Sequence, residues 1–243
     1  MVSKKALENK EGFIVRLASF RDNDLMVTSL GPDGFFSFLA RGGKKEGSKN
    51  FSSLGLLSYS TFSLIPNGAS FSLSEGKLLV SPPYKDDLGV MSSLSFLAEI
   101  SSKLVGEEEA PESFKWLKGA MEALSKDFSP FTLDLIVLAH FLINLGYGLE
   151  LDSCVNCGKK MGIVGVSYEL GGFLCKEEDE ISLKKYSPRS LNILRYAFKC
   201  SLNDLSRVPF GKEETLEIIK DLGEYAEEGA GVTLRSLPIL LKS

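Results

Sequence analysis

Four cysteines are the residues of this 243-residue chain whose types and spacing point most clearly to chemistry. Cys154 and Cys157 are separated by two residues and followed by Gly158, a spacing that lets both sulfurs bind one metal ion. Cys175, in the segment GGFLC, lies where a second pair would begin, but Glu178 stands at the partner position where a cysteine would complete the site. The pattern indicates half of a structural zinc site.

Three interpretations of the cysteines remain open from the sequence. A carboxylate, Glu178 or Asp179, could complete a zinc site with Cys154, Cys157 and Cys175. Cys200, inside a predicted helix, could fold back as the fourth ligand. The site could also be degenerate and held by packing alone. A catalytic zinc requires an open coordination position beside a base, and no such base stands near these cysteines.

A basic loop is the second group of candidate functional residues. It presents Arg41, Lys44, Lys45 and Lys49 against a single Glu46. Residues 1–80 hold ten Lys or Arg and seven Asp or Glu, whereas residues 81–243 hold 18 and 25, within a net charge of −4. A basic loop at the rim of a small barrel can bind a phosphate backbone, although lysines in a loop often serve only solvation.

The elements before this loop read as short strands. Apolar runs over 12–19, 24–30 and 33–40 are separated by turn residues, with Gly31-Pro32-Asp33-Gly34 as the strongest turn signal. Further runs cover 54–66, 69–75 and 77–82, and Asn67-Gly68 and Glu75-Gly76 are predicted turns. Five or six strands at these spacings favour an OB-fold barrel.

Beyond Pro82-Pro83 the apolar period becomes helical. We predict helices over 88–105, from Pro111 to about 124, from Ser129-Pro130 to about 145, from Ser187-Pro188 to about 200, and over 212–227. The class is therefore α+β, an N-terminal barrel followed by a helical domain with an inserted zinc-finger-like module. The predicted domains are residues 1–80, 81–150 (helical, first part), 151–186 (the cysteine module) and 187–243 (helical, second part).

Several function classes find no support. There is no run of 18 apolar residues and no signal-peptide pattern, so we expect a cytoplasmic protein without a membrane. The one histidine, His140, lies in an apolar stretch, where a core histidine is a better interpretation than a general base. No P-loop, GxSxG or HExxH motif is present, so we expect no enzyme.

The segments FIVRLASFRDNDLMVTSL, LARGGKK, CVNCGKK, GGFLC and GVTLRSLPILL together resemble the bacterial RecO family of recombination mediators, across essentially the whole chain. The resemblance implies an OB-fold and a helical domain interrupted by a zinc finger. It implies binding of single- and double-stranded DNA, annealing of complementary strands, and help in loading RecA onto single strands together with RecR. The implied partners are RecR, the C-terminal tail of the single-stranded-DNA-binding protein, and in some pathways RecF.

The resemblance also assigns candidate residues. The DNA-contact candidates are Arg16, Arg21, Arg41, Lys44, Lys45 and Lys49, and the zinc ligands that carry over are Cys154, Cys157 and Cys175. Glu178, where the chain departs from the family's pattern, is the candidate fourth ligand. Arg16 could instead pair with Asp24. Phe35, Phe36 and Phe38 could stack on bases, but alternation places at least one of them in the core. The competing function is a protein–protein adaptor between RecR and the single-stranded-DNA-binding protein.

Overall fold

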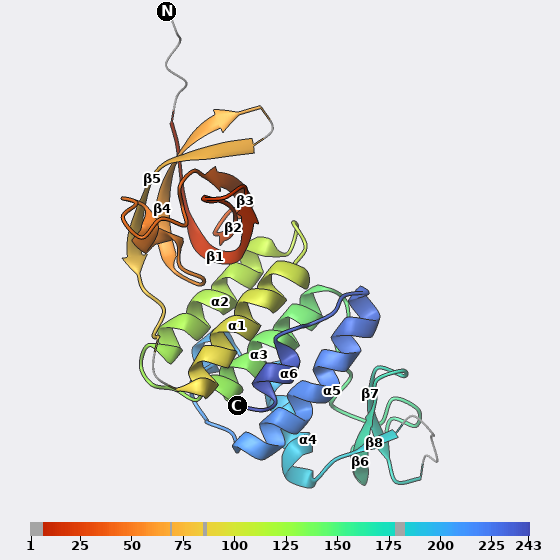
Figure 1. Ribbon diagram of the computed structural model, residues 1–243. Coiled ribbons are helices and arrows are strands. Elements are labelled where there is room, and N and C mark those ends of the chain that lie inside the picture. Colours follow the sequence, from red (N-terminus) through yellow and green to blue (C-terminus); the bar gives the residue numbers. More distant parts are fainter. Residues whose placement is uncertain (1–6, 69, 85–86, 178–182) are drawn as a thin grey trace, which may run out of the picture.

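The computed structural model describes residues 7–68, 70–84, 87–177 and 183–243, and it places a small barrel on top of a helical bundle (Figure 1). The barrel strands are β1 (Glu8–Phe20), β2 (Asp24–Gly31), β3 (Gly34–Ala40), β4 (Tyr59–Asn67) and β5 (Ser70–Val80). They close in the order β1-β2-β3-β5-β4, with β3 and β5 parallel and the other pairs antiparallel. This arrangement confirms the predicted OB-fold barrel.

The barrel interior follows from the alternation of the strands. Ile14, Val27, Phe38, Phe62 and Leu64 are fully or almost fully buried inside it and form one apolar cluster. The neighbouring residues along each strand therefore face outward, since successive side chains of a strand point to opposite faces. The exterior of β1, β2 and β3 thus carries both polar and apolar side chains.

Two details of the predicted barrel are wrong. Glu75-Gly76 is not a turn, because β5 runs through it with an irregular register opposite β4. The run that begins at Leu54 does not start as a strand, because a short 3-10 helix, η1 (Phe51–Leu54), and a turn precede β4. Asn67-Gly68 does form the expected hairpin between β4 and β5.

The helical domain contains α1 (Leu88–Lys103), α2 (Ala110–Leu124), α3 (Pro130–Asn144), α4 (Pro188–Lys199), η2 (Leu202–Asp204), α5 (Lys212–Ala230) and α6 (Leu237–Leu240). The proline positions predicted the starts of α2, α3 and α4 correctly, because proline fits the first helical turn. Ser187 also caps α4 by accepting a hydrogen bond from the backbone N–H of Ser190. Within the described residues, no helix is long and apolar enough to cross a membrane.

Helix α3 is the centre of the bundle, because its sequence is apolar on nearly every side. All residues from Phe131 to Ala139 are buried, and α1, α2, α4 and α5 pack around it (Figure 1). Barrel and bundle share one core: Phe13 of β1 lies 5.8 Å from Phe114 of α2, measured between ring centroids.

The cysteine module lies between α3 and α4 and holds a three-stranded sheet, β6 (Ile163–Ser167), β7 (Gly172–Cys175) and β8 (Leu183–Lys185), in the order β7-β6-β8. It is fastened to α5 through Asp221. Tyr186 donates a hydrogen bond to this carboxylate, and the Lys184 ammonium lies 3.1 Å from it. The module is thus held in a fixed position beside the bundle.

Candidate nucleic-acid interface and metal centre

The basic loop sits at one end of the barrel, beside the β1–β2 turn, and is fixed by its backbone. The Gly42 N–H donates to the Asp24 carboxylate at 2.8 Å, and the Lys44 N–H donates to the carbonyl of Asn23 at 3.1 Å. Both acceptors lie at the β1–β2 turn. The loop therefore lies against that turn and leaves its long side chains in solvent.

Five basic side chains gather at this end, and we call them the basic rim: Arg21, Arg41, Lys44, Lys45 and Lys49. All five are exposed. The Lys44 ammonium lies 3.5 Å from the backbone carbonyl of Arg21, which brings turn and loop together. In the part of the chain that the structure describes, none of the five forms an ion pair. The rim is thus a group of uncompensated positive charges, suited to phosphates.

Arg16, the sixth candidate, lies elsewhere. It is exposed on the barrel exterior, and it lines a cleft between β1 and the helical domain. The alternative pairing with Asp24 does not occur among the described interactions, because that carboxylate holds the loop through Gly42. The structure therefore separates Arg16 from the other five candidates.

The aromatic residues at this end differ from those singled out by the sequence. Phe36 and Phe38 are buried in the barrel, and Phe35 packs against the core shared with the bundle. Phe20 and Phe51 are instead 39% and 47% exposed, the first beside the Arg21 guanidinium and the second directly after the basic loop. Sequence reasoning missed both. Their position directly beside the β1–β2 turn and the basic loop was the available signal.

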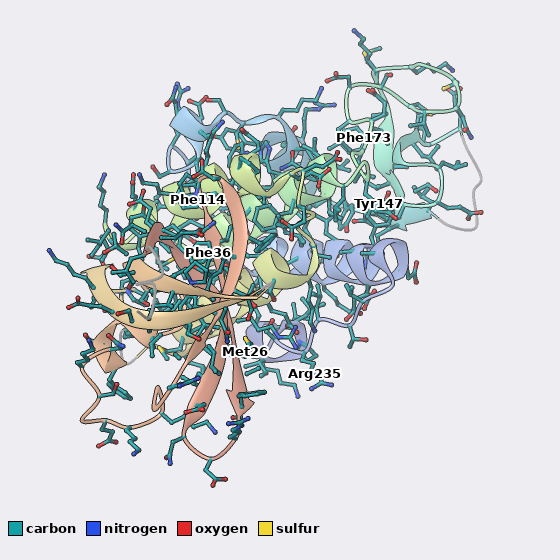
Figure 2. The ribbon with its side chains drawn as sticks, turned by 90° about the horizontal axis from the view of Figure 1, so that it is seen from above. Met26, Phe36, Phe114, Tyr147, Phe173 and Arg235 are labelled. Carbon is teal, nitrogen blue, oxygen red and sulfur yellow. The ribbon has the colours of Figure 1, made fainter. Side chains whose placement is uncertain are left out.

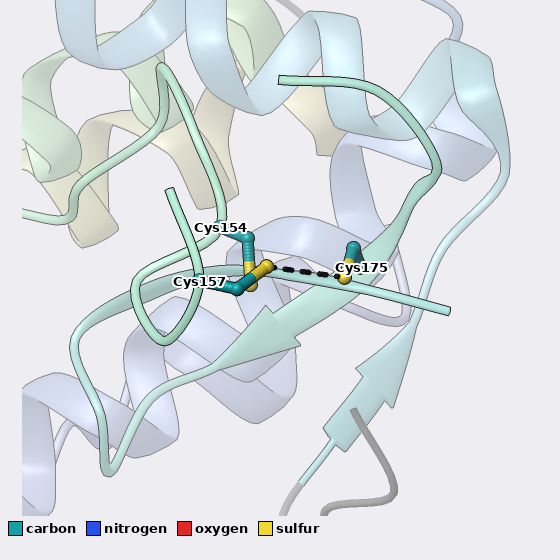
Figure 3. A group of neighbouring side chains, drawn as sticks. All are labelled: Cys154, Cys157 and Cys175. Atoms are coloured by element: carbon teal, nitrogen blue, oxygen red, sulfur yellow. Dashed lines mark hydrogen bonds between the residues drawn. The ribbon is translucent and has the colours of Figure 1, made fainter. Parts of the chain in front are cut away.

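The three cysteines predicted to bind metal do converge (Figure 3). The sulfurs of Cys154, Cys157 and Cys175 all lie within 4.8 Å of one another, with Cys154 and Cys175 buried and Cys157 exposed. The Cys157 and Cys175 sulfurs are 3.6 Å apart. Tetrahedral zinc with Zn–S bonds of about 2.3 Å separates its sulfurs by about 3.8 Å, so the observed cluster fits such an ion.

The backbone around Cys154 prepares this site further. Gly158 has φ of +72°, and its N–H donates to the Cys154 carbonyl at 2.8 Å, which closes the tight turn expected after the cysteine pair. Burial raises the pKa of the Cys154 thiol, but backbone N–H groups of Cys157, Cys175 and Asn156 directed at the sulfur outweigh it and lower the pKa to about 7. A thiolate is the form that binds zinc.

The fourth ligand is not placed. Glu178 and Asp179 lie outside the described residues. Cys200 is not part of the cluster: it is buried at the end of α4, where its sulfur lies 3.9 Å from Nε2 of His140. The interpretation in which Cys200 folds back as a ligand is therefore wrong, because the core of the bundle holds it in place.

His140 has the environment of a core histidine. Its ring stacks on Trp116 with centroids 3.5 Å apart. Burial lowers the pKa of His140 to about 4, against weaker opposing effects of the Cys200 backbone and the Glu112 charge. The imidazole is therefore neutral near pH 7.

The chain is similar to known proteins over most of its length. Residues 85–238 match the family model described as "Recombination protein O C terminal". The chain is 27% identical over 236 residues to the DNA repair protein RecO of Bacillus pumilus (strain SAFR-032), covering 95% of this chain and 92% of that protein. It is 25% identical over 234 residues to the protein of the same name from Bacillus subtilis (strain 168), covering 93% and 91%.

Proposed function

Since this chain belongs to the RecO family and serves in DNA repair and recombination, we propose that it binds single- and double-stranded DNA and anneals complementary strands. One observation carries the proposal: the basic rim sets five cationic side chains, unpaired among the described residues, at one end of an OB-fold barrel. OB-folds bind oligonucleotides through the loops and outer strands at such an end.

The physical role of the rim in annealing is charge neutralisation. Two single strands repel each other through their phosphates, and the repulsion weakens when protein cations replace the condensed counterions. Holding both strands close also reduces the entropic cost of finding the correct register. No covalent bond changes in this process, so the proposal needs no nucleophile and no enzymatic activity.

DNA binding is tested by fluorescence anisotropy with labelled single strands at several salt concentrations. The double variant Arg41→Gln/Lys44→Gln should bind more weakly, and the slope of log K against log salt should fall by about 0.7 for each lost phosphate contact. The matched control Arg189→Gln/Lys220→Gln removes the same charges from exposed positions of α4 and α5. Equal binding of the two double variants would remove the rim from the interface.

The adaptor function is the second candidate, and a cavity of about 500 Å³ between barrel and α2 favours it. Its lining is largely apolar, including Phe13, Tyr59 and Met121, and it also includes the charged side chains of Lys118, Lys126 and Glu122. An acidic tail with an apolar end fits such a pocket. We assign this pocket to the C-terminal tail of the single-stranded-DNA-binding protein. In this proposal the protein is a mediator that also binds RecR, acts on RecA and in some pathways binds RecF.

A labelled tail peptide tests this assignment. Lys118→Glu should abolish peptide binding, because it reverses a charge that lines the pocket. Lys115→Glu on the same helix is the control, since Lys115 is exposed, pairs with Glu112 and does not line the pocket. Loss of binding in both variants, or in neither, would contradict the assignment.

A structural zinc ion completes the proposal. Cys154, Cys157 and Cys175 would supply three ligands and Glu178 the fourth. The ion would hold the two cysteine segments of the module together, as structural zinc does in small domains. We further propose that the protein acts in the cytoplasm, at the chromosomal DNA.

A further inference from the structure

A cleft of about 630 Å³ lies where the barrel meets the helical domain. One wall is β1 of the barrel, with Arg16. The others are α1, with Ser95 and Ser102, and the segment between α5 and α6, with Arg235. Pockets of this volume typically bind one small molecule. The lining mixes apolar side chains, such as Leu17, Leu56 and Ile239, with three cationic ones and Glu99, and it is therefore more polar than the cavity beside α2.

Two of the charged side chains that line the cleft, Glu99 and Lys103, are paired with each other. The Glu99 carboxylate accepts hydrogen bonds from the backbone N–H groups of Arg235 and Ser236 at 3.0 and 2.7 Å, and it pairs with the Lys103 ammonium at 2.7 Å. Lys103 also donates to the Thr233 carbonyl. These two charges therefore cancel each other.

The guanidinium groups of Arg16 and Arg235 remain without a carboxylate partner among the described residues, and both residues are exposed. One comes from the barrel and the other from the C-terminal segment. Two free arginines in one cleft are suited to an anion with several oxygens, because the guanidinium fork binds phosphate through two hydrogen bonds.

The exterior of the barrel connects this cleft to the basic rim. Arg16, Ala18 and Phe20 alternate along β1 and face outward, and Ala18 pairs with Met26 on β2. Figure 2 shows Met26 and Arg235 on the same side of the molecule, far from Phe173. From Arg16 to Arg21 the strand rises by about 16 Å, so one surface leads from the cleft to the rim.

We propose that the cleft binds a backbone phosphate of single-stranded DNA between Arg16 and Arg235. The bound DNA strand would run from the basic rim along the exterior of β1 and end in this cleft. This inference rests on the proposed DNA binding and extends it. A single strand fits because the cleft admits one nucleotide unit, whereas a duplex does not enter a space of this size. Exposed Phe20 lies on the path, where a base can stack.

The experiment measures binding of two probes to the full chain: an oligothymidine of about 20 nucleotides, longer than one OB-fold site, and a blunt duplex of similar length. Arg16→Gln and Arg235→Gln should each weaken oligothymidine binding roughly tenfold, as expected for a charged hydrogen bond, and lower the salt slope by about 0.7. Duplex binding should not change. Arg189→Gln, an exposed arginine of α4, is the control and should alter neither probe.

The other outcomes are distinguishable. If oligothymidine binding depends on Arg41 and Lys44 but not on Arg16 and Arg235, the cleft is not on the strand path and this inference alone fails. If the cleft variants weaken the binding of duplex and of single strand equally, the effect comes from the loss of positive charge in general, and the inference fails as well. Variants that keep DNA binding but lose the tail peptide would make the cleft a peptide site instead. A wild-type protein that binds no DNA at low salt would overturn the proposed function together with the inference.

Discussion

The side-chain oxygen of Asn50 accepts a hydrogen bond from the backbone N–H of Gly76 at 2.9 Å, and this contact ties the end of the basic loop to strand β5. Asn50 is buried, and its carbonyl in turn accepts the hydroxyl of Ser53 at 2.7 Å. The loop is therefore anchored at both ends, by Asp24 at Gly42 and by Asn50 at Gly76. Such anchoring sets where the rim charges stand before any ligand arrives, which lowers the ordering cost of binding.

Gly76→Ala should destabilise the barrel by about 1–3 kcal/mol, the usual cost of overpacking. A Cβ atom at this position would lie 2.2 Å from the Ser53 hydroxyl and 3.0 Å from its Cβ, so the loop end would have to move. Gly47→Ala, in the same loop but with no atom within 4 Å of the added Cβ, is the matched control. Urea denaturation measures both. Equal stability of the two variants would show that the loop end yields without cost.

Glu99→Gln should lower the free energy of unfolding by about 1–3 kcal/mol, the range for hydrogen bonds to charged groups. Burial raises the pKa of this carboxyl, but the hydrogen bonds from Lys103, Ser236 and Arg235 together outweigh it and hold the pKa below its usual value. A depressed pKa means stability that is present above the unfolded-state pKa and is lost as the pH falls through the folded-state value.

The pH dependence separates this effect from simple packing loss. Wild type and Glu99→Gln should differ most at neutral pH, and the difference should shrink as the pH falls through the lowered folded-state pKa, where the wild-type carboxyl also becomes protonated. Urea denaturation at pH 7 and in acid measures it. A gap that stays constant with pH would contradict the role of the charge.

The sequence predicted those parts of the fold that depend on local signals. Strand alternation and the Gly31–Gly34 turn predicted the first three barrel strands, and the prolines at 111, 130 and 188 predicted the starts of three helices. The failure at Glu75-Gly76 has a different origin. The glycine is needed because Ser53 approaches β5 closely there, and this contact between distant segments leaves no local pattern.

The candidate site likewise contains residues with a local sequence signal and residues whose position depends on distant packing. The metal-ligand cysteines carry their own spacing signal, so their convergence could be predicted, whereas the placement of Cys200 beside His140 depends on how α3 and α4 pack. Arg235 had no signal at all. It meets Arg16 in one cleft only because the C-terminal segment folds back along α1, where Glu99 holds it.

Asp134→Asn should stabilise the bundle at pH 8, by at least about 1 kcal/mol. Asp134 is fully buried in α3; one oxygen accepts the Ser93 hydroxyl at 2.7 Å, and the other has no partner among the described residues. Burial raises the pKa of Asp134 to about 8, although the Ser93 hydrogen bond opposes the shift. For an acid with a raised pKa, stability declines as the pH rises from the unfolded-state pKa, near 4, to the folded-state value.

Asparagine keeps an acceptor for Ser93 and carries no titratable proton, so the variant should lose this part of the decline. Urea denaturation of both proteins at pH 5 and pH 8 is the measurement. An equal loss of stability between the two pH values in wild type and variant would show that Asp134 does not titrate in the bundle.

Cys175→Ser and Cys200→Ser should differ in metal content. The Cys175 sulfur lies in the cluster with Cys154 and Cys157, whereas the Cys200 sulfur lies apart, in the core of the bundle. Removing one thiolate from a structural zinc site removes metal and the folding energy that the metal supplies. We therefore expect one zinc per chain by elemental analysis in wild type and Cys200→Ser, and a strongly reduced content in Cys175→Ser.

The Tyr186–Asp221 hydrogen bond should keep the rest of the module attached to α5. The loss of order in Cys175→Ser should therefore be confined to the cysteine turns and measurable as faster amide exchange there. Zinc retained by Cys175→Ser, or lost from Cys200→Ser, would contradict the ligand assignment.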